Sequence, residues 1–306
     1  MALSACPAFR IGQAQDEEAR TGCTVILCEG GAVCGVDVRG GSPATRDTDA
    51  LHPAANRRHV HAVLLTGGSS FGLNAAGGVM RFLEEKGVGR DVAVTHVPNV
   101  AAAALFDLKC GRADVRPDEA MGYEACENAW NRAAFRSGRF GAGCGATVGK
   151  AFGREYAMDG GAGAVLLREG ELLVGAVAAV NCVGDVVQGG EIIAGAKDAA
   201  GRFLDSEAGI LQNYASNRDF FSEKEGENTV LACVFTNARL DKAAMTRVAA
   251  HGQNGIAGTI RPAHSVFDGD VVFAVCSGEV AAHQDAVGIL AAAAVARAIA
   301  RAVAAV

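Results

Sequence analysis

The sequence predicts an α+β fold, a single domain over residues 1–306 in which mainly antiparallel sheets are covered by helices. Two pairs of apolar segments are each joined by a short glycine-containing turn, which is typical of β-hairpins. Other apolar runs lead into stretches with the residue spacing of an amphipathic helix. No Pro/Ser-rich or Gly/Ser-rich linker interrupts the chain, so we expect the strands and helices to share one domain.

Composition limits the possible function classes. Of the 306 residues, 50% are hydrophobic and 20% are charged, as in ordinary globular proteins. The formal net charge of -6 and the lack of Lys/Arg-rich runs argue against nucleic acid as a partner. The N-terminal residues lack the basic and apolar regions of a signal peptide, so we do not expect secretion by that route.

The ten cysteines indicate a reduced compartment. None forms a CxxC pair, and several lie within apolar runs, where a thiol behaves as a small hydrophobic group. We therefore expect a cytoplasmic protein. The apolar stretch that begins at Ala286 is interrupted by Arg297 and Arg301, so we interpret it as a buried helix rather than a membrane span.

Strands and a helix are expected in the first third of the chain. The segments CTVILCEG (23–30) and AVCGVDVRG (32–40) are separated by glycine and predict a hairpin. The apolar run HAVLLT (61–66) leads through TGGSS into apolar residues at helical spacing, which predicts a strand, a tight turn and a helix.

Similar patterns continue along the chain. The segment 116–135 predicts a helix with proline near its first turn, and the segment 161–181 predicts a hairpin that turns at REGE. In the polar stretch 185–228 we expect a partial helix at about 191–200 and an exposed loop that ends at Asn228. The last expected elements are the strand TVLACVFTN (229–237), a helix over 240–260, the strand DVVFAVCSGE (270–279) and the C-terminal helix.

Thr229 is the sharpest candidate for chemistry because it stands where a charged, loop-like stretch meets an apolar strand. A threonine hydroxyl is a poor nucleophile unless a base lies beside it, and the α-amino group of an N-terminal threonine is one such base. The ordinary pKa of that amine, about 7.7 to 8.0, lets it accept the hydroxyl proton near neutral pH. This use requires a cut before Thr229. The alternative is that Thr229 is simply the first residue of a strand.

A pair of carboxylates forms the second candidate, in HSVFDGD (264–270). Asp268 and Asp270 alternate around Gly269, so on an extended backbone both carboxylates point to one side. They could orient a nucleophile or bind a substrate ammonium group, and the alternative is an Asx turn.

Two glycine-rich segments are weaker candidates. GAGCGATVGK (141–150) departs from the phosphate-loop pattern because alanine follows Lys150, although its four glycines still indicate a close backbone approach. TGGSSFG (66–72) contains a loose nucleophile elbow around Ser70, for which His264 is the most suggestive partner. The alternative role for Ser69 or Ser70 is an N-cap of the following helix.

Taken together, these segments resemble the family of L-aminopeptidase/D-esterases, which includes β-peptidyl aminopeptidases and nylon-oligomer hydrolases. The similarity covers nearly the whole chain. The motifs that carry it are VDVRGGSPATRDTDAL, LLTGGSSFGLNAAGGVMRFLEEKGVG, VPNVAAAALFDL, RPDEAMGYEA, GAGCGATVGK, AVAAVNCVGD, ENTVLACVFTNARL and IRPAHSVFDGDVVFAV. Many ordered motifs in one chain are more specific than any single motif.

The resemblance implies a maturation step and a fold. Members of this family are made as inactive chains that cleave themselves before a Ser or Thr, which implies a cut between Asn228 and Thr229 into chains 1–228 and 229–306. The implied fold is the aminopeptidase/ornithine acetyltransferase-like αββα sandwich, two mainly antiparallel sheets flanked by helices. The resemblance also implies a homo-oligomer, a tetramer of processed units.

The resemblance also assigns roles to side chains. Lys150 matches a catalytic-site lysine, and Asn181 matches an asparagine of the oxyanion hole. Asp268 and Asp270 match the pair that orients the nucleophile and its amine. A valine follows Thr229 where many members have a second hydroxyl residue, GATV replaces GTGM, and a tyrosine that assists the oxyanion has no clear match. The preference among α-, D-, β- and ω-amino amides is therefore left open.

The leading hypothesis is a self-processing N-terminal-threonine amide hydrolase or aminopeptidase that acts on small peptides or amino-acid amides through an acyl-threonine intermediate. One alternative is an acyltransferase of the ornithine acetyltransferase type. Another is an unprocessed, non-catalytic binding member of the fold. We expect no cofactor and no metal, because the histidines show no ligand spacing such as HExxH.

Overall fold

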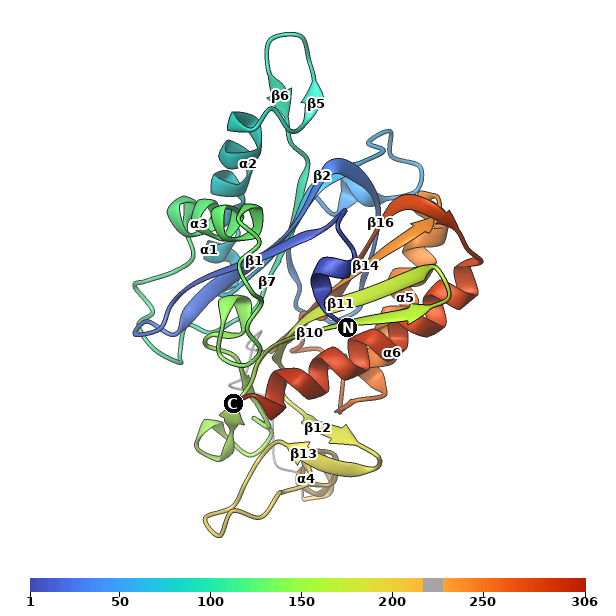
Figure 1. Ribbon diagram of the computed structural model, residues 1–306. Coiled ribbons are helices and arrows are strands. Elements are labelled where there is room, and N and C mark those ends of the chain that lie inside the picture. The colour runs from blue at the N-terminus through green and yellow to red at the C-terminus, as the bar shows by residue number, and fades with distance from the viewer. Residues whose placement is uncertain (217–227) are drawn as a thin grey trace.

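The computed structural model describes residues 1–216 and 228–306. Within these ranges, nine strands are connected by hydrogen bonds (Figure 1). Eight of them follow the order β10-β11-β14-β16-β2-β4-β7-β3, and β1 pairs with β2 off this path. These strands are β1 (Arg10–Asp16), β2 (Thr21–Val38), β3 (Ala44–Arg46), β4 (Val60–Thr66), β7 (Val100–Ala104), β10 (Gly161–Glu169), β11 (Leu172–Asn181), β14 (Thr229–Arg239) and β16 (Val271–Ala281). Most neighbours are antiparallel, whereas β4 and β7, and β14 and β16, run parallel.

Shorter strands and helices complete the described chain. The short strands are β5 (Arg90–Asp91), β6 (His96–Val97), β8 (Thr147–Val148), β9 (Met158–Asp159), β12 (Asp185–Gln188), β13 (Glu191–Ala194) and β15 (Ile260–Arg261). The α-helices are α1 (Ser69–Gly72), α2 (Ala75–Glu85), α3 (Glu119–Trp130), α4 (Ser206–Ala215), α5 (Lys242–Ala257) and α6 (Gln284–Ala304). Figure 1 shows the β5–β6 hairpin and the β12–β13 pair with α4 projecting at opposite ends of the molecule.

The strand β2 connects two sheets. Its first part pairs with β4, and its last part pairs with β16. Its register against β4 shifts between Leu27 and Ala32, around Gly30 and Gly31, and Gly31 has a φ of +75°. The hairpin predicted over 23–40 is therefore wrong, because a bulge lets one continuous strand bend from one sheet into the other.

Helices cover the outer faces of the two sheets. The helices α2 and α3 pack on the sheet that contains β1, β4 and β7, and α5 and α6 pack on the sheet that contains β10, β11, β14 and β16. Alternate side chains of β14 divide between layers: Val230 and Val234 face the helices, while Leu231 and Phe235 face the other sheet. The expected αββα sandwich is confirmed.

Most other predicted elements are confirmed as well. The strand, turn and helix around TGGSS correspond to β4, α1 and α2, and the hairpin that turns at REGE corresponds to β10 and β11. The helix α3 begins at Glu119 with Asp118 as its N-cap, so the proline of this segment precedes the helix. The strands and helices expected after Thr229 correspond to β14, α5, β16 and α6.

The stretch after residue 185 differs from its prediction. The helix expected at about 191–200 is wrong, because Glu191–Ala194 form the strand β13, which pairs with β12. The tight turn between the two strands is made by Gly189 and Gly190, whose φ values are +62° and +91°. The helix of this region is α4, where Asp205 is the N-cap. The loop expected before Asn228 falls mostly on 217–227, outside the described residues, and Asn228 itself is buried rather than exposed.

The C-terminal helix α6 is long and apolar enough to cross a membrane by composition alone. Half of its most apolar window is buried, however, and the helix packs on β10, β11 and α5. Its exposed edge carries Arg297 and Arg301, and the Arg301 guanidinium donates a hydrogen bond to the Ala164 carbonyl of β10 (3.1 Å). The apolar composition of α6 is accounted for by its place in the core.

The contact between β2 and α5 predicts an asymmetry between two glycines of one strand. A Cβ atom on Gly35 would overlap the backbone of Met245 and Thr246, whereas a Cβ on Gly30 would meet no atom of the described residues within 4 Å. We expect Gly35→Ala to reduce the free energy of unfolding by about 3 kcal/mol through overpacking, and Gly30→Ala to change it by less than about 0.5 kcal/mol. Thermal unfolding of the two variants measures this difference, and equal melting temperatures would contradict it.

Candidate active site

Three strand ends meet at Thr229. Thr229 is the first residue of β14, and it stands opposite Asn181, the last residue of β11, in the antiparallel pair. On the other side of β14, the parallel strand β16 begins directly after Asp270. Because parallel strands begin at the same edge of a sheet, Asn228 comes to lie beside Asp268, with which it forms an isolated parallel bridge.

The peptide bond between Asn228 and Thr229 is held at its carbonyl oxygen. The backbone N–H of Gly269 donates a hydrogen bond to the Asn228 oxygen (2.8 Å), and the Thr229 hydroxyl also donates to that oxygen. A Cβ atom on Gly269 would lie 2.7 Å from the Thr229 hydroxyl oxygen and 2.7 Å from the Ser42 carbonyl oxygen. Only glycine fits at this position, and its amide is aimed at the bond before Thr229.

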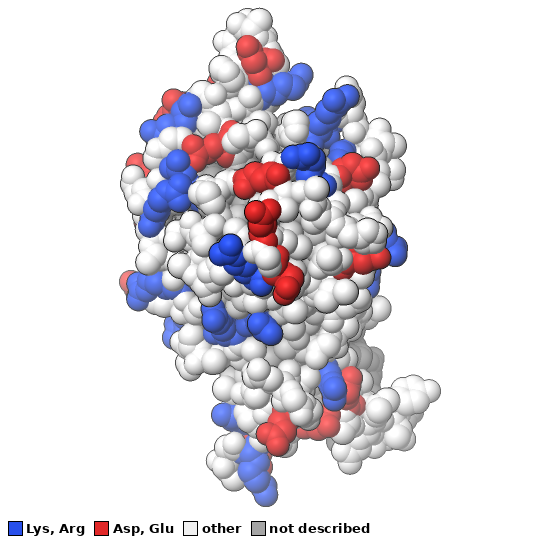
Figure 2. Space-filling model, turned by 45° about the vertical axis from the view of Figure 1, so that its right-hand side comes forward, with Lys and Arg blue, Asp and Glu red and all other residues white. Residues whose placement is uncertain are grey.

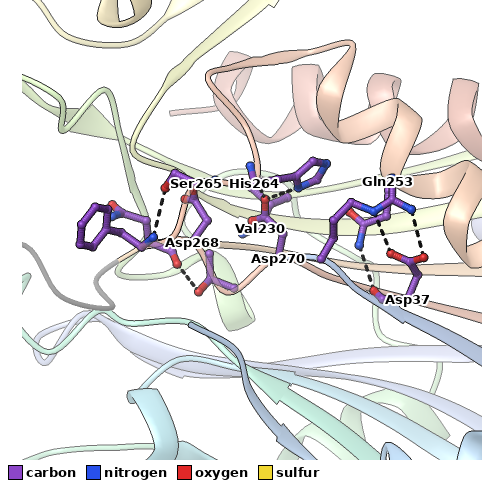
Figure 3. Close-up of polar contacts among 11 residues, drawn as sticks. Asp37, Val230, Gln253, His264, Ser265, Asp268 and Asp270 are labelled. Carbon is purple, nitrogen blue, oxygen red and sulfur yellow. Dashed lines mark hydrogen bonds and ion pairs between the residues drawn. The ribbon is translucent and has the colours of Figure 1, made fainter. Parts of the chain in front are cut away.

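Asp270 holds the start of β14 in place. Its Oδ1 accepts a hydrogen bond from the backbone N–H of Val230 (2.7 Å), the residue that follows Thr229. Its Oδ2 accepts hydrogen bonds from the backbone N–H of His264 (3.1 Å) and lies 2.7 Å from Nδ1 of the same residue (Figure 3). The Asp270 side chain is buried and all three contacts come from fixed groups, so its carboxylate connects β14 to the loop before β16.

Asp268 is buried beside this carboxylate. Its Oδ2 accepts hydrogen bonds from the Ser265 backbone N–H (2.9 Å) and hydroxyl (2.6 Å), whereas its Oδ1 has no hydrogen-bond partner in the described part of the chain (Figure 3). Burial raises the pKa of Asp268 to about 6, and the neighbouring charge of Asp270 contributes in the same direction. Asp268 is therefore a carboxylate that can change protonation state near neutral pH.

Lys150 and Asn181 form the other side of the site. The Lys150 ammonium donates hydrogen bonds to the backbone oxygen (3.1 Å) and the side-chain Oδ1 (2.9 Å) of Asn181. The Asn181 Oδ1 also accepts from the Thr147 backbone N–H (3.0 Å), and its Nδ2 donates to the Phe106 carbonyl (2.9 Å). Burial lowers the pKa of Lys150 to about 8, and the nearby Asp268 charge opposes this shift. The two predicted residues are thus fixed together.

The glycine-rich segment 141–150 has the close backbone approaches that its sequence predicts. A Cβ atom on Gly145 would overlap the Arg20 carbonyl, and one on Gly149 would overlap the backbone of Ala196. Gly149 also has a φ of +73° and donates a hydrogen bond to the Gly184 carbonyl (2.9 Å). The segment positions Lys150 beside the end of β11 rather than forming a phosphate loop.

The alternative site around Ser70 is arranged differently. Ser70 is exposed in α1, and the N-cap of that helix is Gly68 with no side-chain hydrogen bond, so the predicted cap role of Ser69 or Ser70 is wrong. Gly68 fits there because its φ of +79° is accessible to glycine. The partner proposed for Ser70, His264, contacts Asp270 instead.

Sequence reasoning missed three contributors to the site. The amide of Gly269 contacts the Asn228 carbonyl, Ser265 holds Asp268, and His264 holds Asp270. All three lie in the segment HSVFDGD that was singled out for its carboxylates. The signal in the sequence was the short spacing between the polar residues of this segment. Which hydrogen bonds these residues form depends on the conformation of the loop before β16.

Comparison with known proteins gives relatives that span most of the chain. An uncharacterised aminopeptidase of Mycobacterium leprae (strain TN) is 42% identical over 268 residues, which are 85% of this chain and 72% of the relative. A 6-aminohexanoate-oligomer endohydrolase of Paenarthrobacter ureafaciens is 31% identical over 281 residues, which are 90% of this chain and 74% of the relative.

Solved structures share the fold at low sequence identity. An L-aminopeptidase D-Ala-esterase/amidase from Ochrobactrum anthropi, described as a variant of the Ntn hydrolase fold, has a TM-score of 0.70 at 16% identity and covers 99% of this chain and 86% of that one. A β-aminopeptidase of a Burkholderia species has a TM-score of 0.67 at 18% identity with the same coverage.

The family is decided by a match over almost the whole sequence. The model of peptidase family S58 matches residues 5–306. The predicted resemblance to the aminopeptidases and nylon-oligomer hydrolases is thereby confirmed, and with it a hydrolase of the peptidase class. The chain belongs to peptidase family S58.

Proposed function

We propose that this hydrolase cleaves its own chain between Asn228 and Thr229, and then uses Thr229 as an N-terminal nucleophile on small peptides or amino-acid amides. The observation that carries the proposal is the contact of the Thr229 hydroxyl with the Asn228 carbonyl, which also accepts the Gly269 N–H. A nucleophile, a polarised carbonyl and buried charged groups therefore meet at one peptide bond.

Self-cleavage would proceed through an ester. The Thr229 oxygen attacks the Asn228 carbonyl carbon, the peptide C–N bond breaks, and the hydroxyl proton is transferred to the leaving nitrogen. Water then hydrolyses the ester, which leaves a carboxylate on Asn228 and a free amine on Thr229. The Gly269 N–H stabilises the negative charge that develops on the Asn228 oxygen.

Turnover would use the new amine as the base. It accepts the Thr229 hydroxyl proton while the oxygen attacks the substrate carbonyl, and the proton then goes to the amine product as the acyl-threonine forms. Water releases the acid. The amide of Asn181 would stabilise the oxyanion, Asp268 and Asp270 would orient the amine, and the Lys150 ammonium would lower the amine's pKa.

The substrate class follows from the charge of the site. With both carboxylates ionised and Lys150 protonated, these three groups carry a net charge of about -1, which favours a substrate with a free ammonium end. The names of the relatives describe aminopeptidase and oligomer hydrolysis rather than acyl transfer, which favours hydrolysis here.

Partners and location remain predictions. On the face shown in Figure 2, Lys and Arg side chains are interspersed with Asp and Glu, without a broad basic area of the kind that binds nucleic acid. Assembly into tetramers of processed units would be measured by sedimentation, and a cytoplasmic location would be measured by cell fractionation.

The first test removes the nucleophile. Thr229→Ala should leave the 31.1 kDa chain intact after long incubation and should reduce amide hydrolysis by a factor of about 1,000 or more. Denaturing gels and intact-mass measurement follow the cleavage. The matched control, Thr229→Ser, keeps a hydroxyl and should still be cut. Hydrolysis that survives in Thr229→Ala would move the nucleophile elsewhere.

The second test follows the buried lysine. Because the pKa of Lys150 is about 8 in the folded protein and 10.5 in the reference state, the unfolded chain binds more protons between these values. Stability contributed by this residue therefore rises with pH across that window and is lost as pH falls through about 8. In the uncut Thr229→Ala chain, Lys150 should make the free energy of unfolding rise by up to about 3 kcal/mol between pH 8 and pH 10.5. Lys150→Met in the same chain should abolish this rise.

Chemical unfolding at several pH values between 8 and 10.5 measures the difference between Thr229→Ala and the double variant. Lys86→Met in the same background removes an exposed lysine at the end of α2 and provides the baseline. If the difference in the free energy of unfolding between Thr229→Ala and the double variant does not change with pH, the lowered pKa of Lys150 is contradicted.

The third test concerns the free amino end. In a panel of L-, D-, β- and ω-amino amides, each compound is compared with its N-acetylated form. The unblocked amide should have the higher kcat/KM by at least about tenfold, equivalent to about 1.4 kcal/mol of transition-state binding. Equal rates for the two forms would exclude recognition of the amine.

A further inference from the structure

His264 is held in an uncommon backbone conformation next to the site. Its φ is +58°, a region that residues other than glycine seldom adopt. In this conformation both its backbone N–H and its ring Nδ1 reach the same oxygen, Oδ2 of Asp270, at 3.1 and 2.7 Å. The structure thus maintains a strained position at which one residue contacts one carboxylate oxygen twice.

Among the residues that the structure describes, the ring makes a single polar contact. A carboxylate can only accept hydrogen bonds, so Nδ1 carries the proton that joins it to Asp270. The other ring nitrogen, Nε2, is buried and has no hydrogen-bond partner in the described ranges. The ring is therefore committed to Asp270, and Figure 3 shows it on the side of that carboxylate away from Val230.

The two oxygens of Asp270 connect His264 to the nucleophile. Oδ2 takes both contacts from His264, and Oδ1 accepts the backbone N–H of Val230 at 2.7 Å. The peptide group that contains this N–H begins at the carbonyl carbon of Thr229. A rotation of the Asp270 carboxylate would therefore move the residue that carries the nucleophilic hydroxyl.

We propose that His264 is a positioning residue of the active site, which holds the Asp270 carboxylate so that this group fixes the Thr229–Val230 peptide for catalysis. This role rests on the proposed function of Thr229. It replaces the triad role considered for His264 with Ser70. It assigns to His264 no contact with substrate and no proton transfer to the reacting atoms.

The physical basis is the precision that catalysis requires. Without the ring N–H, the Asp270 carboxylate keeps two backbone hydrogen bonds, from His264 to Oδ2 and from Val230 to Oδ1, so its orientation is fixed less firmly. Displacements of about 1 Å in a reacting group can cost 100-fold in rate. At metal sites, the loss of a hydrogen bond that orients a ligand typically costs about 10- to 100-fold, and we expect a similar effect for a carboxylate that fixes a nucleophile.

Two substitutions separate the ring contact from the backbone conformation. Glycine and asparagine both accept a positive φ, but only asparagine has a side-chain N–H that can take the place of Nδ1. We expect His264→Gly to reduce kcat by about 10- to 100-fold with KM changed less than threefold. His264→Asn should keep kcat within about fivefold of the wild type, since it retains the donor. His59→Asn, at an exposed histidine, is the matched control.

The measurement is kcat and KM per mole of cut chain, with the cut fraction taken from denaturing gels so that slow maturation is not counted as slow turnover. Wild-type kcat in His264→Gly would overturn the proposal, and so would an equal loss in both variants, because backbone strain would then explain it. If the wild-type chain neither cuts itself nor hydrolyses amides, the proposed function fails instead. If His264→Gly does not fold, His264→Asn still tests the role. This variant keeps a side-chain N–H and accepts the positive φ, so kcat within about fivefold of the wild type supports the role and a larger loss overturns it.

Discussion

The parallel pairing of β14 with β16 is the constraint on which the site depends. Leu231 stands beside Val271, and this register places Asn228 next to Asp268 and brings the Gly269 N–H to the Asn228 oxygen. The register is specified by burial, since alternate residues of both strands fill the layer between the sheets. A slip of one residue would turn those side chains toward the helices. The geometry at the bond before Thr229 is therefore a consequence of the core.

Burying charged groups at this edge costs free energy, which explains how densely they are hydrogen-bonded. Asp270 accepts from backbone groups of β14 and of the loop before β16, and the Lys150 ammonium donates to two oxygens of Asn181. Within residues 1–216 and 228–306, Asp268 accepts hydrogen bonds on one oxygen only. Its raised pKa is the expected result, because burial penalises its charge more than its hydrogen bonds favour it. The core supplies the stability that this arrangement lacks.

Much of the fold could be predicted because local patterns and long-range packing agree. The continuous apolar run of β14 agrees with a strand that is buried on both faces, and the helical spacing in α2 indicates the face that packs in the core. The prediction failed beside two pairs of glycines. Gly30 and Gly31 form a bulge within one strand rather than the turn of a hairpin, and Gly189 and Gly190 form a turn that leads into the strand β13 rather than into the predicted helix. The spacing of residues in the sequence does not show whether a glycine pair forms a turn or a bulge, because this depends on which strand pairs with the segment.

The site shows a similar limit. Thr229, Asn181 and Asp268 could be named from the sequence because their residue types suit the chemistry and their motifs resemble one family. The structure adds that they lie at the ends of adjacent strands. Their separations along the sequence do not reveal this. The contacts of Gly269 and His264 at this site were missed, because Gly269 acts through its backbone amide and His264, which the sequence suggested as a partner of Ser70, contacts Asp270.

Two donors able to polarise a carbonyl flank Thr229 from opposite sides. Gly269 lies on the β16 side and contacts the Asn228 oxygen, whereas Asn181 lies on the β11 side, where its amide contacts the Phe106 carbonyl. Since β14 lies between these strands, the bond before Thr229 and an incoming substrate need not share a donor. Under the proposed mechanism, the same hydroxyl could therefore serve two reactions in sequence. The fixed group common to both is Asp270, which holds the Thr229–Val230 peptide through its Oδ1.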